Sequence, residues 1–323
     1  MTRVAVARNA MATRFEIVLF GKDSNALRAA GEEALNEIER LEAQLSMYRP
    51  SSEIANINAR AHREPVRVEP SLFRLLQHAK QLSDETEGAF DITIAPLMRA
   101  WRLMGSVAAD VSRLTTPSRA ELNAARACVG MHLLELDPKN FTIRFARPGV
   151  MLDLGAIGKG YAIDQAVEIL RESGVTRALI HGGTSTAYAI GGPWKIAISP
   201  QDSSSRRESA HSSDETLAIV SLKNTALSVS AVWGKSFRVG KKTYGHVIDP
   251  RTGKPVQRAL LAAVILPSAT ETDALSTALL TVGIPGHKKI TRLRKGIRSL
   301  VLDPDSKTSS EGIATKKREK DKT

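Results

Sequence analysis

The chain has 323 residues, of which 42% are hydrophobic and only 4% aromatic. This length predicts one large domain or two interlocked α/β lobes, with a core built mainly from Leu, Ile, Val and Ala. The single cysteine, Cys128, excludes an intrachain disulfide and a cysteine-based zinc site, while the formal net charge is +12.

The first twenty residues, MTRVAVARNAMATRFEIVLF, carry Arg3, Arg8 and Arg14 inside their apolar runs. No hydrophobic signal region or small-residue cleavage site is visible there. No other segment approaches the apolar length that a membrane span requires. We therefore expect a cytoplasmic protein without a transmembrane segment.

The N-terminal third predicts one strand followed by two helices. Residues 13–20 form a strand that Gly21 ends, and Ser24 is expected to cap the first helix. Apolar positions at alternating spacings of three and four define one face of that helix, namely Leu27, Gly31, Ala34, Ile38, Leu41 and Leu45. A second helix is expected from Ser71, with its region ending at Gly88.

The rest of the chain alternates strands, turns and helices without an internal repeat. After a Gly-punctuated turn at 153–159, a helix is predicted over 161–170, and a final helix over 270–282. Strands are predicted at 132–136, 141–145, 178–181, 194–198, 217–222, 226–232, 236–239, 244–248 and 260–266. The polar run at 201–215 is interpreted as a mobile loop. This order predicts an α+β architecture with mixed sheets and packed helices.

The positive charge is concentrated at the C-terminal end. Residues 287–323 hold 12 Lys and Arg against 5 Asp and Glu, a net charge of +7. We therefore divide the chain into a main domain at 1–286, a basic segment at 287–305 and a disordered basic tail at 306–323. A nucleic-acid-binding tail is the alternative. A solubilising tail is favoured because no aromatic residue lies among these charges, so no specific nucleic-acid partner is expected.

The segment LDLGAIGKGYAID, residues 152–164, places Gly155, Gly158 and Gly160 at the start of a helix. Glycines allow a close approach of backbone to ligand, helix N-termini favour anions, and Lys159 adds a cation. This chemistry suits a pyrophosphate. A plain tight turn with Lys159 in solvent is the alternative.

The segment ATETDALSTALLTVG, residues 269–283, places Asp273 and Thr277 one helical turn apart. A carboxylate and a hydroxyl in this arrangement suit a hard divalent cation such as Mg²⁺. A capping interaction between Thr270 and Asp273 at the helix start is the alternative.

Three further segments contain candidate residues that also have ordinary structural explanations. In YGHVIDPRTGKPV, His246 could accept a proton near neutral pH, or could be a structural histidine. In EGAFDITIAPLMRAW, Asp91 is a half-buried carboxylate or a turn residue. In LSMYRPSSEIANIN, Tyr48 could stack on a flat heterocycle or pack against the protein.

Taken together and in this order, the motifs resemble the FAD:protein FMN transferase family, also called the ApbE family, from about Met11 to about Gly283. The resemblance rests on Met11-Ala12-Thr13, Ser46-Met47-Tyr48-Arg49-Pro50, Asn58, Gly88-Ala89-Phe90-Asp91, Asp153-Leu154-Gly155, Lys159-Gly160-Tyr161, His181-Gly182-Gly183, His246-Val247-Ile248-Asp249-Pro250, Thr252-Gly253 and Asp273-Ala274-Leu275-Ser276-Thr277.

The resemblance implies two interlocked lobes of the flavin-transferase type over residues 1–286. It also implies Mg²⁺-dependent transfer of FMN from FAD, the substrate, to a Thr or Ser hydroxyl of an acceptor protein, with release of AMP. The residues it assigns to the FAD site are Met11, Tyr48, Ala89, Phe90, Asp91, Asp153, Lys159 and the backbone of Val247. The metal would be held by the carbonyl of Ala156, the carboxylate of Asp273 and the hydroxyl of Thr277. His246 would act as the base, with Asp273 assisting.

Two motifs differ from the family pattern. Thr184 follows Gly182-Gly183 where the family commonly has Asp, and Val229-Ser230-Ala231 stands where it commonly has Thr-Ser-Gly. Two alternatives therefore remain beside the transferase: a pyrophosphatase that hydrolyses FAD to FMN and AMP, and a catalytically impaired flavin-binding protein.

Overall fold

The computed structural model describes residues 1–104, 116–200, 216–233, 236–239 and 242–315. The polar insertion at 201–215 lies outside the described residues, as do residues 316–323 of the basic tail. The fold is α+β, as the sequence predicted. Within the described part of the chain, no helix is both long enough and apolar enough to cross a membrane.

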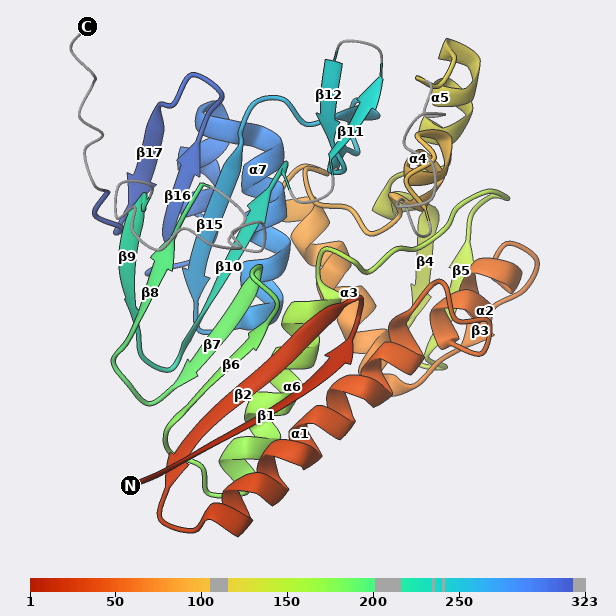
Figure 1. Cartoon of the computed structure of the whole chain (residues 1–323). Coiled ribbons are helices and arrows are strands. Elements are labelled where there is room, and N and C mark those ends of the chain that lie inside the picture. The colour runs from red at the N-terminus through yellow and green to blue at the C-terminus, as the bar shows by residue number, and fades with distance from the viewer. Residues whose placement is uncertain (105–115, 201–215, 234–235, 240–241, 316–323) are drawn as a thin grey trace, which may run out of the picture.

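An eight-stranded sheet forms the centre of the molecule (Figure 1). Its strands, in spatial order, are β1 (Thr2–Ala10), β2 (Thr13–Gly21), β6 (Ala178–Gly182), β7 (Thr186–Ile190), β10 (Thr225–Ala231), β15 (Leu261–Leu266), β16 (Arg298–Leu302) and β17 (Thr308–Glu311). Every neighbouring pair in this order is antiparallel. Strands β1 and β2 join through a two-residue turn at Met11 and Ala12.

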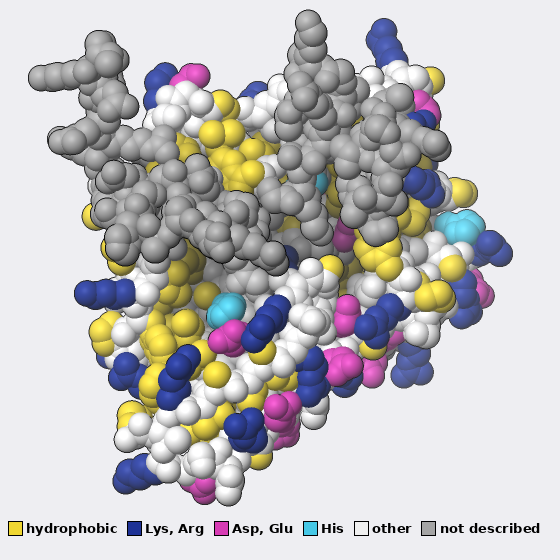
Figure 2. Space-filling model, viewed as in Figure 1, with side chains coloured by type: hydrophobic (Ala, Val, Ile, Leu, Met, Phe, Trp, Pro, Cys, Tyr) yellow, Lys and Arg dark blue, Asp and Glu magenta, His cyan; other side chains and the backbone are white. Residues whose placement is uncertain are grey.

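Three long helices cover one face of this sheet (Figure 1): α1 (Ser24–Leu45), α6 (Gly158–Glu172) and α7 (Ala269–Thr291). The face of α1 that the spacing predicted is buried, and Ile38 and Leu41 are each only 1% exposed. Its N-cap is Asp23 rather than the expected Ser24, because the Asp23 carboxylate accepts hydrogen bonds from the backbone amides of Asn25 and Ala26. The outer face carries ion pairs such as Arg40–Glu37, and basic and acidic side chains alternate there in Figure 2.

A hairpin covers part of the other sheet face. It consists of β8 (Trp194–Ile198) and β9 (Ala218–Leu222), which form a second core with β15 and β16. Strand β15 is buried on both sides: Ala262, Val264 and Leu266 face the helices, while the alternate residues face the hairpin. This arrangement explains its continuous apolar sequence.

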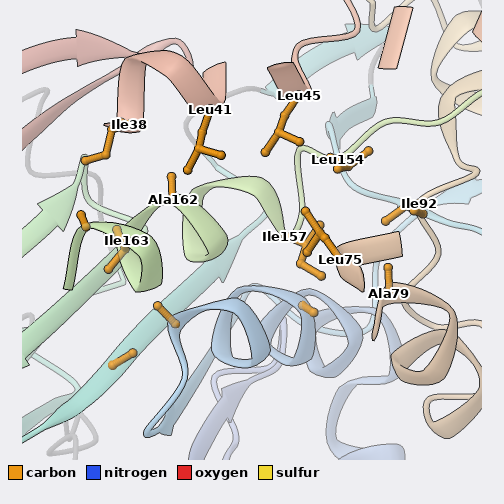
Figure 3. Close-up of a cluster of buried hydrophobic side chains, with 14 of the residues drawn as sticks. Ile38, Leu41, Leu45, Leu75, Ala79, Ile92, Leu154, Ile157, Ala162 and Ile163 are labelled. Carbon is orange, nitrogen blue, oxygen red and sulfur yellow. The ribbon is translucent and has the colours of Figure 1, made fainter. Parts of the chain in front are cut away.

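The second lobe contains one longer helix, several shorter helices and small sheets. Its elements are α2 (Glu53–Arg60), β3 (Val66–Arg67), α3 (Pro70–Glu85), α4 (Ala95–Ala100), α5 (Arg119–Arg126), the 3₁₀ turn Met131–Leu133, β4 (Leu134–Asp137), β5 (Thr142–Phe145), β11 (Ser236–Val239), β12 (Lys242–Gly245), β13 (Ile248–Asp249) and β14 (Lys254–Pro255). One hydrophobic cluster joins both lobes, since Leu75 and Ala79 of α3 lie beside Ile157 and Ile92 in Figure 3.

The C-terminal region departs from the sequence interpretation. Helix α7 passes through a kink at Gly283, with φ 65° and ψ −162°, and continues to Thr291. Strand β16 then pairs with β15, so residues 287–302 are part of the main fold rather than a separate basic segment. Residues 308–311, expected in the disordered tail, form the edge strand β17. Edge strands need only one ladder of backbone hydrogen bonds, and a polar sequence such as TSSE can form it.

Candidate active site

The first turn of α6 lies against the first half of α7. The backbone N–H of Gly160 donates to Oδ2 of Asp273 at 3.1 Å. Gly160 lies in the first turn of α6, whose N-cap is Ile157, so its N–H has no acceptor within the helix and Asp273 supplies one from α7. Ala156 precedes the N-cap of α6, so its carbonyl oxygen is not part of the regular hydrogen-bond ladder of the helix.

Only glycine fits at position 160. A Cβ added there would lie 2.2 Å from the carbonyl oxygen of Ala269 and 2.9 Å from Cβ of Asp273. The close contact between the two helices therefore depends on the missing side chain. This is the physical reason for one of the three glycines that the sequence places in this motif.

The Asp273 carboxylate is buried, with 6% of its side chain exposed, beside the cation of Lys159. Lys159 Nζ is 3.7 Å from Asp273 Oδ2, and it also donates to the carbonyl of Gly155 at 3.1 Å. A buried carboxylate requires such partners because burial alone disfavours its charge. The alternative in which Lys159 extends freely into solvent is therefore wrong.

The Thr277 hydroxyl lies one turn further along α7. It donates to the carbonyl of Asp273 at 3.2 Å and is 3.2 Å from the hydroxyl of Ser230, which comes from β10. Ser230 is also 2.8 Å from the hydroxyl of Ser276. The capping alternative for Asp273 is wrong, because the N-cap of α7 is Ser268, whose hydroxyl accepts from the backbone of Glu271 at 3.2 Å.

The Ala156 carbonyl, the Asp273 carboxylate and the Thr277 hydroxyl form a donor set of hard oxygen ligands. Such ligands suit Mg²⁺, which keeps several waters or phosphate oxygens and needs few protein carboxylates. No cluster of three His, Cys, Asp or Glu side chains exists among the described residues, so a carboxylate-rich metal cage is absent from this part of the chain. The residues present fit a magnesium ion that is shared with a phosphate ligand.

Asp91 and Asp153 lie in adjacent segments, since the N–H of Asp153 donates to the carbonyl of Ile92 at 2.7 Å. Asp91 is 8% exposed and accepts from the backbone and hydroxyl of Thr93 at 2.7 and 2.6 Å, and from the Met131 amide at 3.2 Å. Burial raises the pKa of Asp91 above its usual range, although these hydrogen bonds oppose the shift. Asp91 therefore stabilises a turn through Thr93, which agrees with the interpretation of Asp91 as a turn residue.

Ala89 and Phe90 are each 1% exposed, and their side chains pack in the main core. The structure thus buries both side chains in protein and leaves them no exposed surface for a ligand in this conformation. Asp153 lies at the surface end of the same region, where its Oδ1 accepts from the Gly155 amide at 2.8 Å. Leu152, the residue before Asp153, is held by Asn58. The Asn58 side-chain amide donates to the Leu152 carbonyl at 3.0 Å and accepts from the Leu152 N–H at 2.7 Å.

Met11 occupies the turn between β1 and β2. Its φ is 50° and that of Ala12 is 58°, values that favour Gly or Asn over residues with larger side chains. Strained non-glycine turns are frequent at ligand sites. The Gly183 N–H donates to the Arg14 carbonyl at 2.9 Å, so the segment before Thr184 lies against this turn.

Tyr48 lies in the turn after α1 and is 57% exposed, so its ring is not part of the hydrophobic core. His246 and Val247 lie between β12 and β13, and His246 is half-buried. The Val247 carbonyl accepts from the Val256 amide at 2.9 Å. The following turn is held by Trp101, whose Nε1 donates to the Gly253 carbonyl at 2.7 Å.

The structure therefore brings Lys159 of α6 together with Asp273 and Thr277 of α7, while Ala156 lies two residues before α6. Sequence reasoning missed two residues around them, Ser230 and Asp164. The Asp164 side chain of α6 accepts hydrogen bonds from the first residues of α7. The helical period offered a signal for Asp164, which lies one turn after Gly160 in the same quoted motif.

Comparisons with known proteins identify the family and the fold. The sequence model of the ApbE family matches residues 11–301. The FAD:protein FMN transferase of Salmonella typhimurium is 28% identical over 300 residues, which cover 90% of this chain and 82% of that protein. The enzyme of the same name from Klebsiella pneumoniae is 29% identical over 293 residues, covering 87% of this chain and 79% of that protein.

Solved structures show the same fold. The crystal structure of the ApbE protein from Thermotoga maritima superposes with a TM-score of 0.84 at 26% identity, covering 96% of this chain and 97% of that one. The flavinyl transferase ApbE of Pseudomonas stutzeri, in its apo form, gives a TM-score of 0.81 at 26% identity, with coverages of 96% and 95%.

Proposed function

The chain belongs to the ApbE family, and from this premise we propose that it is a magnesium-dependent FAD:protein FMN transferase. The substrate is FAD, the acceptor is a Thr or Ser hydroxyl on another protein, and the second product is AMP. The observation that best supports the proposal is the position of the Asp273 carboxylate, which accepts from the first-turn amide of Gly160 and lies beside Lys159 at the start of α6.

The reaction is a phosphoryl-type transfer in which one phosphorus–oxygen bond is exchanged for another. The acceptor oxygen attacks the phosphorus of the FMN half, the bond from this phosphorus to the bridging oxygen breaks, and AMP leaves with that oxygen. The acceptor hydroxyl loses its proton to the neutral imidazole of His246. A bound Mg²⁺ ion would neutralise pyrophosphate charge and polarise a phosphoryl oxygen.

Each remaining residue of the site would bind or orient. Asp273, Thr277 and the Ala156 carbonyl would hold the metal. The hydrogen bond from the Gly160 amide to Oδ2 fixes the orientation of the Asp273 carboxylate relative to that metal. Lys159 lies at the positive end of α6 and would bind a phosphate oxygen there. Met11, Tyr48, Asp91, Asp153 and the backbone around Phe90 and Val247 would surround the rest of FAD.

The two motif departures motivate the alternatives. Ala231 is the last residue of β10, pairs with Leu261 and carries a Cβ where the family commonly has glycine. Thr184 lacks the carboxylate that commonly follows the two glycines. Neither departure removes Asp273, Thr277 or His246, and for this reason the transferase is favoured over a protein that only binds flavin.

The decisive experiment incubates purified protein with FAD and an acceptor peptide, with and without Mg²⁺. AMP release is followed by chromatography and the peptide by mass. A matched peptide with Ala in place of the acceptor Thr is the control. AMP together with a peptide bearing one FMN, only with Mg²⁺ and Thr, supports the proposal. AMP with free FMN alone identifies the pyrophosphatase, and FAD that is bound by the protein but stays intact in every condition identifies the impaired flavin-binding protein.

A further inference from the structure

Asp164 forms an unusually complete cap between two helices. Its carboxylate accepts from the Ser268 hydroxyl at 2.8 Å, the Ala269 amide at 2.8 Å, and the amide and hydroxyl of Thr270 at 2.9 and 2.7 Å. These groups begin α7, whereas Asp164 belongs to α6. A capping side chain normally accepts hydrogen bonds from the first amides of its own helix. Asp164 of α6 instead accepts them from the first residues of α7 and so links the two helices.

The helical period connects this cap to the proposed metal site. On α6, Asp164 follows Gly160 by one turn, and on α7 Asp273 follows Ala269 by one turn. The cap joins Asp164 to Ala269, and one turn away Gly160 meets Asp273 at 3.1 Å. A slip of α7 by one turn along α6 would displace Asp273 by about 5.4 Å.

The hydrogen bonds of Asp164 constrain that position more directly than the steric contact does. The Gly160–Ala269 approach is a close steric contact, which allows sliding along the helix axis. The hydrogen bonds to Asp164 are directional and involve two backbone amides of α7, so they set its axial position. The charged carboxylate also sits at the positive end of the α7 dipole.

We propose that Asp164 is a positioning residue for the metal site: by capping α7 from α6 it holds Asp273 in register with Gly160. Asp164 itself contacts neither metal nor substrate. The proposal rests on the proposed function only for the identity of the ion. The register effect itself concerns two helices of the metal-free protein.

The test compares the wild-type protein with Asp164→Asn, which retains the side-chain shape but can no longer accept from all four donors. The first readout is amide hydrogen exchange without metal. We expect exchange of the Gly160 amide to accelerate on the order of tenfold or more, because its bond to Asp273 weakens although Asp164 does not touch it. The second readout is binding of Mn²⁺ alone, followed by electron paramagnetic resonance. We expect affinity to fall roughly tenfold or more, as for other residues that orient metal ligands.

The control is Asp23→Ala, which removes both cap hydrogen bonds of α1. It should change neither Gly160 exchange nor Mn²⁺ affinity. If Asp164→Asn prevents folding, Thr270→Val replaces it, since this variant removes a single 2.7 Å hydroxyl bond to Asp164. A smaller change in the same direction is expected there.

One result would overturn the proposal: faster exchange at Thr270 with unchanged exchange at Gly160 in either variant. Asp164 would then be a helix cap only. The exchange measurement decides the matter even if Mn²⁺ binds weakly to the wild type. Failure of the proposed function is distinguishable, because it appears as absent FMN transfer by the wild-type protein and leaves the exchange comparison intact.

Discussion

The substitution Gly160→Ala tests whether close packing of α6 on α7 determines the active-site geometry. The new Cβ would lie 2.2 Å from the Ala269 carbonyl oxygen, and real Cβ contacts essentially never fall below 3.0 Å. The helices must therefore separate by at least 0.8 Å, the difference between these two distances. The obstructing atom is backbone, so no side-chain rotation relieves the contact.

This separation acts on the 3.1 Å hydrogen bond between the Gly160 amide and Asp273. Lengthening it by a similar amount takes it beyond the ~3.5 Å limit of a hydrogen bond. A displacement of about 1 Å in a catalytic group costs roughly 100-fold in rate. Overpacking costs about 1–3 kcal/mol, and the higher helix propensity of Ala returns about 0.5–1 kcal/mol. We therefore expect a stability loss of about 0–2.5 kcal/mol with a much larger loss of FMN transfer.

The assay combines urea unfolding with FMN transfer measured over a range of Mg²⁺ concentrations. Gly158→Ala is the stability control in the same helix, because its Cβ would lie 3.8 Å from the nearest atom, Cβ of Leu154. We expect its free energy of unfolding to be unchanged or higher by up to about 1 kcal/mol. Wild-type stability and a wild-type transfer rate in Gly160→Ala would refute the packing argument.

Three further predictions concern single side chains. Asp273→Ala should reduce Mg²⁺-dependent AMP release by more than ~100-fold while circular dichroism shows a folded protein, and unchanged turnover would contradict its role as a metal ligand. His246→Ala should slow transfer by about 10²–10⁴-fold with FAD affinity largely retained, whereas loss of folding would identify a structural histidine. Burial lowers the pKa of His287 below its usual 6.5, with Glu311 opposing the shift, so its stabilising contribution is complete above pH 6.5 and declines as the pH falls toward the folded-state pKa. Urea midpoints at pH 7.5 and 5.5 should therefore differ less in His287→Gln than in the wild type, and equal differences would rule out this histidine as the cause.

Local patterns were sufficient for much of the secondary structure. The spacing of Ile38 and Leu41 predicted α1, and the continuous apolar run at 260–266 predicted a strand that is buried on both faces. Strands β1, β7 and β17 were not predicted. Their sequences are interrupted by charged, small or polar residues, and they become strands because a neighbouring strand supplies the ladder of hydrogen bonds.

The ordered motifs by themselves determined the family, and the one-turn spacing of Asp273 and Thr277 indicated a shared face of one helix. Only the tertiary structure decided which groups meet that face. Gly160 and Asp273 are 113 residues apart in the chain, and Asp164 and Ala269 are 105 apart. Helical periodicity specifies directions around one axis but not the axial position of a second helix against it. That position depends on the absent Cβ of Gly160 and on the hydrogen bonds of Asp164, which exist only once α6 and α7 have packed.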